Sequence, residues 1–288
     1  MQTTNFLTLP DKRQLAYAEY GDPNGHPAFH FHGSPSSRLE PLILGDEIIN
    51  KFGLRVIAPD RPGVEQSDFQ QNRSFSDWAN NVVFLADALN LDKFSVLGIS
   101  GGCGYVAACA AKIPERLHAA VIVSGAWRMD LNEDLSTTNR FAWFLAKRIP
   151  VLHLGWLKLM QRSLKGNPEE LLPKFKKQFP IADYLILERP DRLEPFCETT
   201  IEAMRRGVKE AAYDVQLYAH EWDFSLDEIQ IPLIMFHGEQ DRNVPIAPIK
   251  RVVASLPTAK LTTYPEEGHF SLMVNQFEAI AKSLVDDI

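Results

Sequence analysis

The stretch Gly98-Ile99-Ser100-Gly101-Gly102 decides the fold, and it follows the apolar run Phe94-Ser95-Val96-Leu97. It matches the pattern G-x-S-x-G, which forces a serine onto a sharp turn between a strand and a helix. Glycine is needed on both sides because a side chain there would clash. A five-residue match also fits an ordinary tight turn, so the rest of the chain must show whether this turn carries a catalytic serine. We predict that Ser100 is a nucleophile.

A serine hydroxyl near neutral pH needs a base that accepts its proton and a third group that orients the base. His269 lies between the last predicted strand and the last predicted helix, and it is the candidate base. Asp241 follows the preceding predicted strand and is the candidate orienting acid. We prefer it to three glutamates nearby: Glu239, Glu266 and Glu267.

Acyl transfer also needs two backbone N–H groups that stabilise the negative oxygen of the tetrahedral intermediate. Gly101 offers one of them at the start of a helix, where the helix dipole assists. Ser34 is the candidate for the second, in a loop after an early predicted strand, and Gly33 permits the turn. The serine hydroxyls of this loop can also cap the following helix, which is compatible with backbone donation.

Strand-like runs alternate with helix-like runs over most of the chain, which predicts a mostly parallel sheet with helices on both faces. The expected strands are residues 15–20, 28–32, 54–58, 94–99, 119–123, 232–237 and 261–264. The expected helices of this part are residues 77–89, 101–113, 246–255 and 271–286, and Pro114 ends the second. Ligands of such sheets bind at the carboxyl ends of the strands, where the candidate residues fall.

Residues 127–222 break this rhythm with helical segments at 140–148, 152–164 and 198–220 and no convincing strand. We therefore predict a core domain of residues 1–126 and 223–288 and a helical cap inserted at 127–222. Aromatic residues of the cap can line an apolar pocket above Ser100, or they can pack the helices together. They are Trp127, Trp143, Trp156, Trp222, Phe141, Phe144, Phe175 and Phe196.

Residues 139–177 contain nine Lys or Arg and two Asp or Glu, although the whole chain has a formal net charge of −7. The plain interpretation is a solvated helix face. The alternative is that this face attracts anionic substrates or rests on a lipid surface. The nine basic residues are Arg140, Lys147, Arg148, Lys158, Arg162, Lys165, Lys174, Lys176 and Lys177.

The composition excludes several classes of protein. The 288 residues, 45% of them hydrophobic, can bury a large core, and the negative charge argues against a nucleic-acid partner. No apolar run approaches the roughly 18 residues of a membrane span, and the first residues lack a signal-peptide pattern, so we expect a cytoplasmic protein without stable membrane insertion. The oligomeric state is open, with a homodimer among the options.

The three cysteines are odd in number and lack metal-type spacing, which argues against a disulfide framework and against a zinc site. Free cysteines are usually buried, so we expect Cys103, Cys109 and Cys197 to be packed residues and not nucleophiles. No metal site is expected.

Five segments together resemble the α/β-hydrolase superfamily, in particular its branch of capped esterases and proline iminopeptidase-like enzymes. This resemblance implies the α/β-hydrolase fold, a Ser100–Asp241–His269 triad in the chain order of that fold, oxyanion donors at Ser34 and Gly101, an inserted cap and chemistry without a cofactor. The segments are His32-Gly33-Ser34-Pro35, Asp60-Arg61-Pro62-Gly63, Gly98 to Gly102, His237-Gly238-Glu239-Gln240-Asp241 and Gly268-His269-Phe270.

The chain departs from this pattern at two places. Val64-Glu65-Gln66-Ser67 stands where the family usually has an aromatic residue and a second glycine, so we expect a reshaped loop. Gly33-Ser34-Pro35 stands where iminopeptidase-like members have two glycines before the proline, so aminopeptidase activity is not predicted.

The predicted function is hydrolysis of a carboxylic ester or a related small acyl compound through an acyl-Ser100 intermediate. A serine at the turn argues against dehalogenases and epoxide hydrolases of the same fold, which attack through a carboxylate. Two alternatives stay open at this point. One is a cofactor-free reaction that is not hydrolysis, such as carbon–carbon bond cleavage or perhydrolysis, and the other is a ligand-binding signal receptor.

Overall fold

The structure is a computed structural model that describes residues 4–127 and 137–286. Within those ranges, eight strands form one sheet in the order β1-β2-β4-β3-β5-β6-β7-β8. Only the pairs β1–β2 and β2–β4 are antiparallel, so the sheet is mostly parallel, as predicted. The strands are β1 (Asn5–Thr8), β2 (Gln14–Gly21), β3 (His26–Phe31), β4 (Leu54–Pro59), β5 (Phe94–Ile99), β6 (Leu117–Val123), β7 (Leu233–Gly238) and β8 (Ala259–Tyr264).

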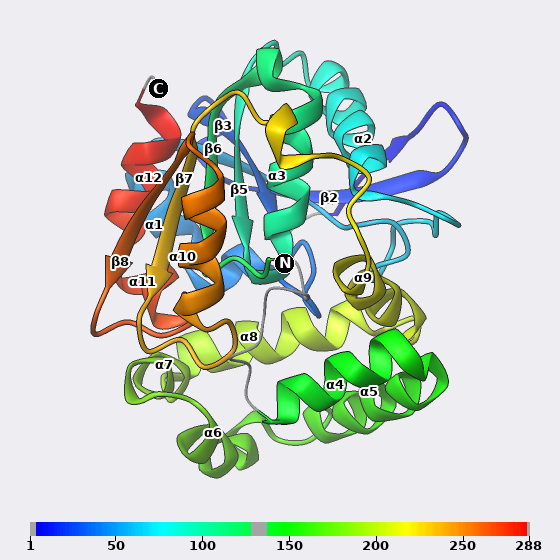
Figure 1. The fold of residues 1–288 in the computed structure, drawn as a ribbon, viewed down its shortest axis with the longest axis vertical. Helices are drawn as coiled ribbons and strands as arrows, with labels where there is room; N and C mark the ends of the chain where they lie inside the picture. Colours follow the sequence, from blue (N-terminus) through cyan, green and yellow to red (C-terminus); the bar gives the residue numbers. More distant parts are fainter. Residues whose placement is uncertain (1–3, 128–136, 287–288) are drawn as a thin grey trace.

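Helices cover both faces of the sheet (Figure 1). One face packs against α2 (Phe75–Ala88), α3 (Cys103–Lys112) and α10 (Ile246–Ser255). The opposite face packs against α1 (Asp46–Lys51) and α12 (Phe277–Val285). The central strand β5 is therefore buried on both sides, which explains its nearly continuous apolar sequence. Shorter helices of this part are η1 (Glu40–Ile43), η2 (Ser100–Gly102), η3 (Pro114–Arg116), η6 (Leu226–Glu228) and α11 (Ser271–Asn275).

Local sequence signals account for the helix ends. Ser74 and Asp77 form a reciprocal capping box at the start of α2. Helix α3 ends at Lys112 before Pro114, as predicted, because proline has no N–H to continue the helix.

Two predicted helices are wrong in extent. The segment 198–220 is interrupted between Ala203 and Lys209, where Gly207 adopts a φ of 129°. The last helix is interrupted at Gln276, whose φ of −107° and ψ of 17° are not helical and whose side-chain amide donates a hydrogen bond to Glu267. In both places a local backbone turn overrides the helical spacing of the apolar residues.

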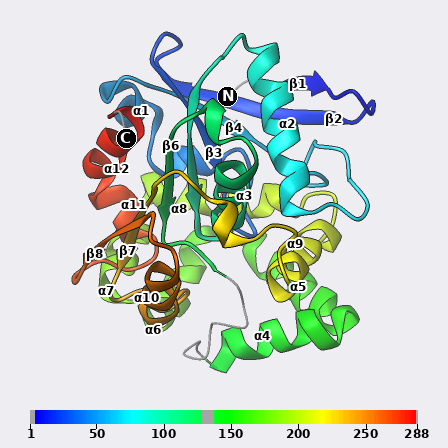
Figure 2. The same ribbon diagram turned by 45° about the horizontal axis from the view of Figure 1, so that its top comes forward.

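Residues 137–222 contribute helices and, among the residues that the structure describes there, no strand. Figures 1 and 2 show these helices across the ends of the parallel strands. We call α4 to α9 the helical layer. Its members, with the short η5 (Pro168–Leu171), are α4 (Thr137–Arg148), α5 (Pro150–Leu164), α6 (Leu172–Gln178), α7 (Ile181–Leu187), α8 (Pro190–Ala203) and α9 (Lys209–Ala219).

The layer corresponds to the predicted cap, but its status as a separate domain stays a prediction. Residues 128–136 of that cap and the side chain of Trp143 lie outside the described part. No helix in the described ranges is long and apolar enough to cross a membrane.

The predicted cap aromatics lie in three environments: the core, the cavity wall and, for Phe141 and Phe144, the exposed surface. Trp127 and Trp222 are buried against each other in the core of the sheet, with ring centroids 5.2 Å apart. Phe175 and Phe196 pack edge to face within the helical layer, and both line the main cavity. The three cysteines are buried and free, as predicted.

Candidate active site

Ser100 lies on a sharp turn between β5 and η2, and its φ of 50° is in the left-handed region that strains non-glycine residues. A Cβ atom at Gly98 would lie 2.6 Å from the Gly102 carbonyl oxygen. A Cβ atom at Gly102 would lie 2.0 Å from the Phe31 carbonyl oxygen. Only glycine fits at these two positions, which explains the motif. The turn places Ser100 on the wall of a cavity of about 470 Å³.

His269 and Asp241 come together at the carboxyl ends of β7 and β8. The Nδ1 atom of His269 is 2.7 Å from Oδ2 of Asp241, and both side chains are buried. The other carboxylate oxygen accepts hydrogen bonds of 2.8 Å from the backbone N–H groups of Asn243 and Val244. Asp241 is therefore held in one orientation facing the imidazole.

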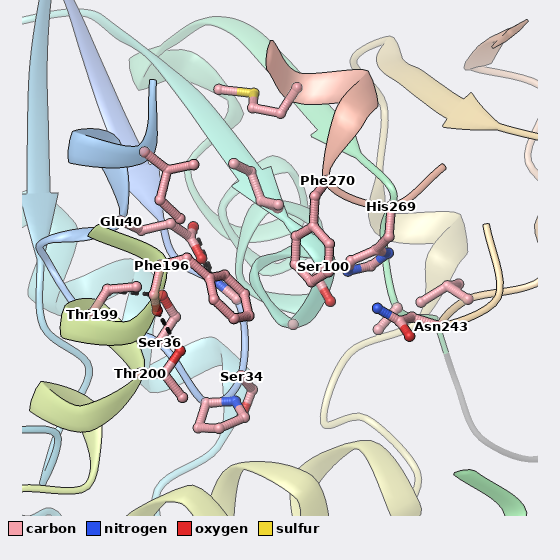
Figure 3. Close-up of a pocket in the computed structure, with 18 of the residues that line it drawn as sticks. Ser34, Ser36, Glu40, Ser100, Phe196, Thr199, Thr200, Asn243, His269 and Phe270 are labelled. Atoms are coloured by element: carbon pink, nitrogen blue, oxygen red, sulfur yellow. Dashed lines mark hydrogen bonds between the residues drawn. The ribbon is translucent and has the colours of Figure 1, made fainter. Parts of the chain in front are cut away.

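The imidazole of His269 lines the same cavity as Ser100. Figure 3 shows the ring beside the Ser100 hydroxyl, with Asn243 beyond it and Glu40 on the opposite side of Ser100. Burial alone would lower the pKa of His269, but the neighbouring Asp241 carboxylate raises it above its ordinary value. The three side chains predicted from distant parts of the chain thus lie at one site. Glu239 and Glu266, two of the alternative acids, make no contact with His269 that the structure records.

A residue that the sequence did not reveal holds the turn around His269. Asp183 of α7 is fully buried, and its carboxylate accepts hydrogen bonds of 2.8 to 2.9 Å from the backbone N–H groups of His269, Phe270 and Ser271. A Cβ atom at Gly268 would lie 2.5 Å from both carboxylate oxygens of Asp183. The glycine before the histidine therefore makes room for a side chain of the helical layer, and no local motif around Asp183 signals this contact.

Ser34 and Gly101 are adjacent, and their role as two donors to one oxygen stays a prediction. A Cβ atom at Gly101 would lie 3.0 Å from the backbone nitrogen of Ser34. The hydroxyl of Ser34 is buried and has no hydrogen-bond partner among the described residues. At η1 the N-cap residue Leu39 makes no side-chain cap, but the Ser37 hydroxyl of this loop accepts a hydrogen bond of 3.3 Å from the Leu39 N–H.

A buried ionic network supports the loop that carries Ser34. The guanidinium group of Arg61 donates hydrogen bonds to the carbonyl oxygens of His32 and Gly33. Arg61 also contacts the carboxylate of Asp214 in α9 at 2.7 Å, and Arg73 contacts the same carboxylate. Burial would raise the pKa of Asp214, but the two guanidinium groups hold it well below its ordinary value. The helical layer is thereby tied to the loop.

The segment 64–67, for which a reshaped loop is expected, makes specific contacts of its own. Glu65 contacts Arg38 at 2.7 Å, and Arg38 also contacts Asp60 at 2.9 Å. The hydroxyl of Ser67 donates to the carbonyl oxygen of Asp60. These contacts connect the Asp60-Arg61-Pro62-Gly63 segment to Arg38, which follows the Ser34 loop.

The cavity has two differently composed sides. The sheet side reaches between η1, α1, β4, β5 and the helices α11 and α12, and it is apolar, with Ile43, Ile49, Val56, Leu97, Met273 and Phe277. The side facing the helical layer is mixed, with His153, Trp156, Met160, Lys174, Gln178 and Phe179.

Glu40 lies where the sheet side begins. Its carboxylate accepts a hydrogen bond of 3.0 Å from the Gly33 N–H and lies 2.8 Å from Nε2 of His30. These contacts fix the position of the carboxylate at this side of the cavity. In the described ranges, no group of three or more His, Cys, Asp or Glu side chains is arranged to hold a metal ion.

Comparisons with known proteins agree with this fold. A family model described as the alpha/beta hydrolase fold matches residues 30–276. A 2-hydroxymuconate semialdehyde hydrolase from Pseudomonas putida is 25% identical over 90% of this chain and 89% of its own. A bifunctional esterase/perhydrolase from Acinetobacter calcoaceticus is 24% identical over 97% of this chain and 98% of its own.

Solved structures show the same fold. A thermophilic esterase from Thermogutta terrifontis superposes with a TM-score of 0.68 at 20% identity, over 98% of this chain and 96% of the other. A probable hydrolytic enzyme from Pseudomonas aeruginosa superposes with a TM-score of 0.69 at 19% identity, over 99% and 95%. Since the family model covers most of the chain, including Ser100, Asp241 and His269, this protein belongs to the alpha/beta hydrolase fold family.

Proposed function

We propose that this protein is a serine hydrolase that cleaves carboxylic esters through an acyl-Ser100 intermediate. The observation that carries the proposal is the imidazole of His269, which lines the same cavity as Ser100 and whose Nδ1 atom lies 2.7 Å from the Asp241 carboxylate behind it. Binding alone needs neither a strained serine nor a buried imidazole held by a carboxylate, so this pair favours an enzyme over a receptor.

The proposed reaction runs in two halves. His269 takes the hydroxyl proton while Ser100 Oγ bonds to the carbonyl carbon, and the carbonyl oxygen becomes an oxyanion next to the Ser34 and Gly101 amides. The intermediate collapses, the ester bond breaks, and the leaving alcohol takes the proton from His269. A water molecule then gives a proton to His269 and attacks the acyl carbon; the bond between that carbon and Ser100 Oγ breaks, the acid leaves, and Oγ takes the proton back from His269. Asp241 stabilises the imidazolium in both halves.

The two sides of the cavity suggest where each half of the ester binds. The leaving group must lie toward His269, because that imidazole protonates it. The acyl chain then extends away from His269, past Glu40, into the apolar sheet side. We propose that the substrate carries a long aliphatic acyl chain, since Val56 and Phe277 offer only apolar contacts there.

One experiment tests the activity itself. Wild-type protein is incubated with a fluorophosphonate and with p-nitrophenyl esters from acetate to laurate, beside Ser100→Ala and Asp241→Asn. We expect covalent labelling of Ser100 and ester turnover in the wild type, none in Ser100→Ala, and a loss of about 10⁴-fold in Asp241→Asn.

Cys103→Ser is the matched control, because that buried thiol is expected to have no catalytic role and turnover should persist. Unlabelled Ser100 in folded wild-type protein, with tight ligand binding that Ser100→Ala leaves unchanged, would favour the receptor instead.

Perhydrolysis is a second candidate, because a relative over nearly the whole length is named a bifunctional esterase/perhydrolase. The same acyl-Ser100 intermediate would then be attacked by hydrogen peroxide, which yields a peracid in place of the acid. Measuring peracid formed from an ester and hydrogen peroxide, against acid formed in water alone, distinguishes the two products.

A further inference from the structure

The outer surface of the helical layer carries an unusual set of exposed apolar side chains. On α5, Leu152, Trp156 and Leu159 are 56%, 36% and 65% exposed. They are spaced i, i+4 and i+7, so they lie on one face of the helix. Phe141 and Phe144 of α4 are 58% and 54% exposed. Soluble monomers rarely expose apolar side chains in such a concentration, which marks an interaction surface.

The same helices carry the basic segment found in the sequence. All nine Lys and Arg of residues 139–177 are exposed, and five of them lie among the apolar residues along α4 and α5: Arg140, Lys147, Arg148, Lys158 and Arg162. An apolar helix surface with a basic border is the combination that lets a helix lie in the boundary of an anionic bilayer, with its apolar side chains among the acyl chains. Figure 2 shows α4 at the outer edge of the molecule, away from the sheet.

We propose that the outer surface of α4 and α5 docks on an anionic lipid surface, and we call it the docking surface. A second copy of this chain fits less well, because a two-fold interface would pair the same basic surface with itself. Anionic headgroups neutralise those charges. Trp156 belongs both to this surface and to the cavity wall, so docking brings the cavity next to the lipid.

Vesicle binding of the full-length protein tests this proposal without relying on the proposed reaction. Ser100→Ala protein is sedimented with phosphatidylcholine vesicles that contain or lack phosphatidylglycerol. We expect binding that depends on phosphatidylglycerol and decreases as salt is raised, because ions screen the attraction.

Two variants separate the apolar from the ionic contribution. The triple variant Phe144→Ser/Leu152→Ser/Leu159→Ser should lower the partition coefficient by about tenfold or more, since three apolar side chains no longer enter the bilayer. Lys158→Glu/Arg162→Glu should remove the preference for phosphatidylglycerol and lower the partition coefficient by a similar factor. The matched control is Phe84→Ser/Lys93→Glu, which changes an exposed aromatic and an exposed cation of the sheet part and should bind like the parent.

Circular dichroism checks that each variant is folded. The same substitutions are also made in protein that keeps Ser100, and turnover of p-nitrophenyl acetate is measured there. None of the changed residues lines the cavity, so this turnover should be unaltered. Two results would overturn the proposal. One is equal binding of the triple variant and the control. The other is a concentration-dependent dimer that the triple variant abolishes while no form of the protein binds vesicles.

Discussion

Asp183 is the side chain of the helical layer on which the position of His269 depends. Its carboxylate accepts three consecutive backbone N–H groups of the turn that carries the imidazole. Burial lowers the pKa of His269, but Asp241 and, to a smaller extent, the negative charge of Asp183 raise it. We therefore regard Asp183 as a positioning residue, which acts on the reaction through His269.

Asp183→Asn tests this role. We expect kcat to fall by up to about 10²-fold, because an amide cannot accept all three hydrogen bonds and the imidazole shifts. The free imidazole is the active form, so activity is lost as the pH falls through the pKa of His269. Removing the negative charge lowers that pKa, and the acidic limb of the kcat/KM profile should move to lower pH.

Asp191→Asn is the control for this measurement, since Asp191 is an exposed acid of α8 paired with Arg189. It should leave both kcat and the acidic limb unchanged. If the Asp183→Asn protein were less stable but its kcat/KM profile kept the same acidic limb, Asp183 would have only a structural role.

At the scale of elements, α9 is bound to the sheet through Asp214. The carboxylate is fully buried between Arg61 and Arg73 and also accepts a hydrogen bond of 2.8 Å from Tyr105. Breaking a buried ion pair by removing one partner typically costs 3–5 kcal/mol, because the remaining charge stays buried without compensation.

We expect Asp214→Asn to lower the free energy of unfolding by about 3–5 kcal/mol in a urea titration. Asp87→Asn removes an exposed ion pair with Arg116 and should cost less than about 1 kcal/mol. Equal stability of the two variants would show that the buried network contributes nothing beyond a surface pair.

The apolar side of the cavity is also a matter of element packing, because it lies between β4, β5, α1 and α12. The strand register aligns Val56 with Ala28 and Ala28 with Ser95. At a rise of about 3.3 Å per residue, the strand from Ser95 to Ser100 spans about 16 Å. Val56 therefore lies far enough from Ser100 along the sheet for a long acyl chain to reach it.

Val56→Phe should block the inner end of the apolar side of the cavity. We expect kcat/KM for p-nitrophenyl laurate to fall by at least about tenfold, while turnover of the acetate is unchanged, since a short chain never reaches Val56. Met160→Phe adds an aromatic ring on the side of the helical layer and should leave the dependence on chain length as it is in the wild type. A parallel loss on acetate and laurate would contradict the assignment of the acyl side.

On the scale of the whole molecule, the helical layer and the sheet share many buried polar contacts. Asp183 and Asp214 provide two of them. In addition, the Thr199 hydroxyl contacts the Ser37 hydroxyl, and the Tyr218 hydroxyl donates to the Gly101 carbonyl oxygen. The guanidinium group of Arg192 adds hydrogen bonds to two backbone carbonyl oxygens near η1. Opening the layer would leave these groups without partners.

We therefore expect the layer and the sheet to unfold in one cooperative transition. Far-ultraviolet and near-ultraviolet circular dichroism should give the same midpoint in urea, because both report a single loss of structure. Two resolved transitions, with the helical signal lost first, would show that the layer unfolds independently.

Much of this molecule follows from local sequence. The turn at Ser100 is dictated by Gly98 and Gly102, whose neighbours leave no room for a side chain. The alternation of strands and helices gives the mostly parallel sheet, and parallel strands carry their following loops to one edge. That is why Asp241 and His269 could be assigned from their places after two strands, and why the comparison of candidate acids favoured the one further from its strand.

The tertiary structure alone decided the remaining features. Asp183 and Asp214 act on residues about 86 and 153 positions away, and no periodicity or motif reports a contact at such a separation. The division of the aromatic residues between core, cavity and outer surface likewise depends on how α4 to α9 pack, since a helix of mixed polarity can turn either face inward. Sequence sets which groups are available along the chain, whereas long-range packing selects which of them meet.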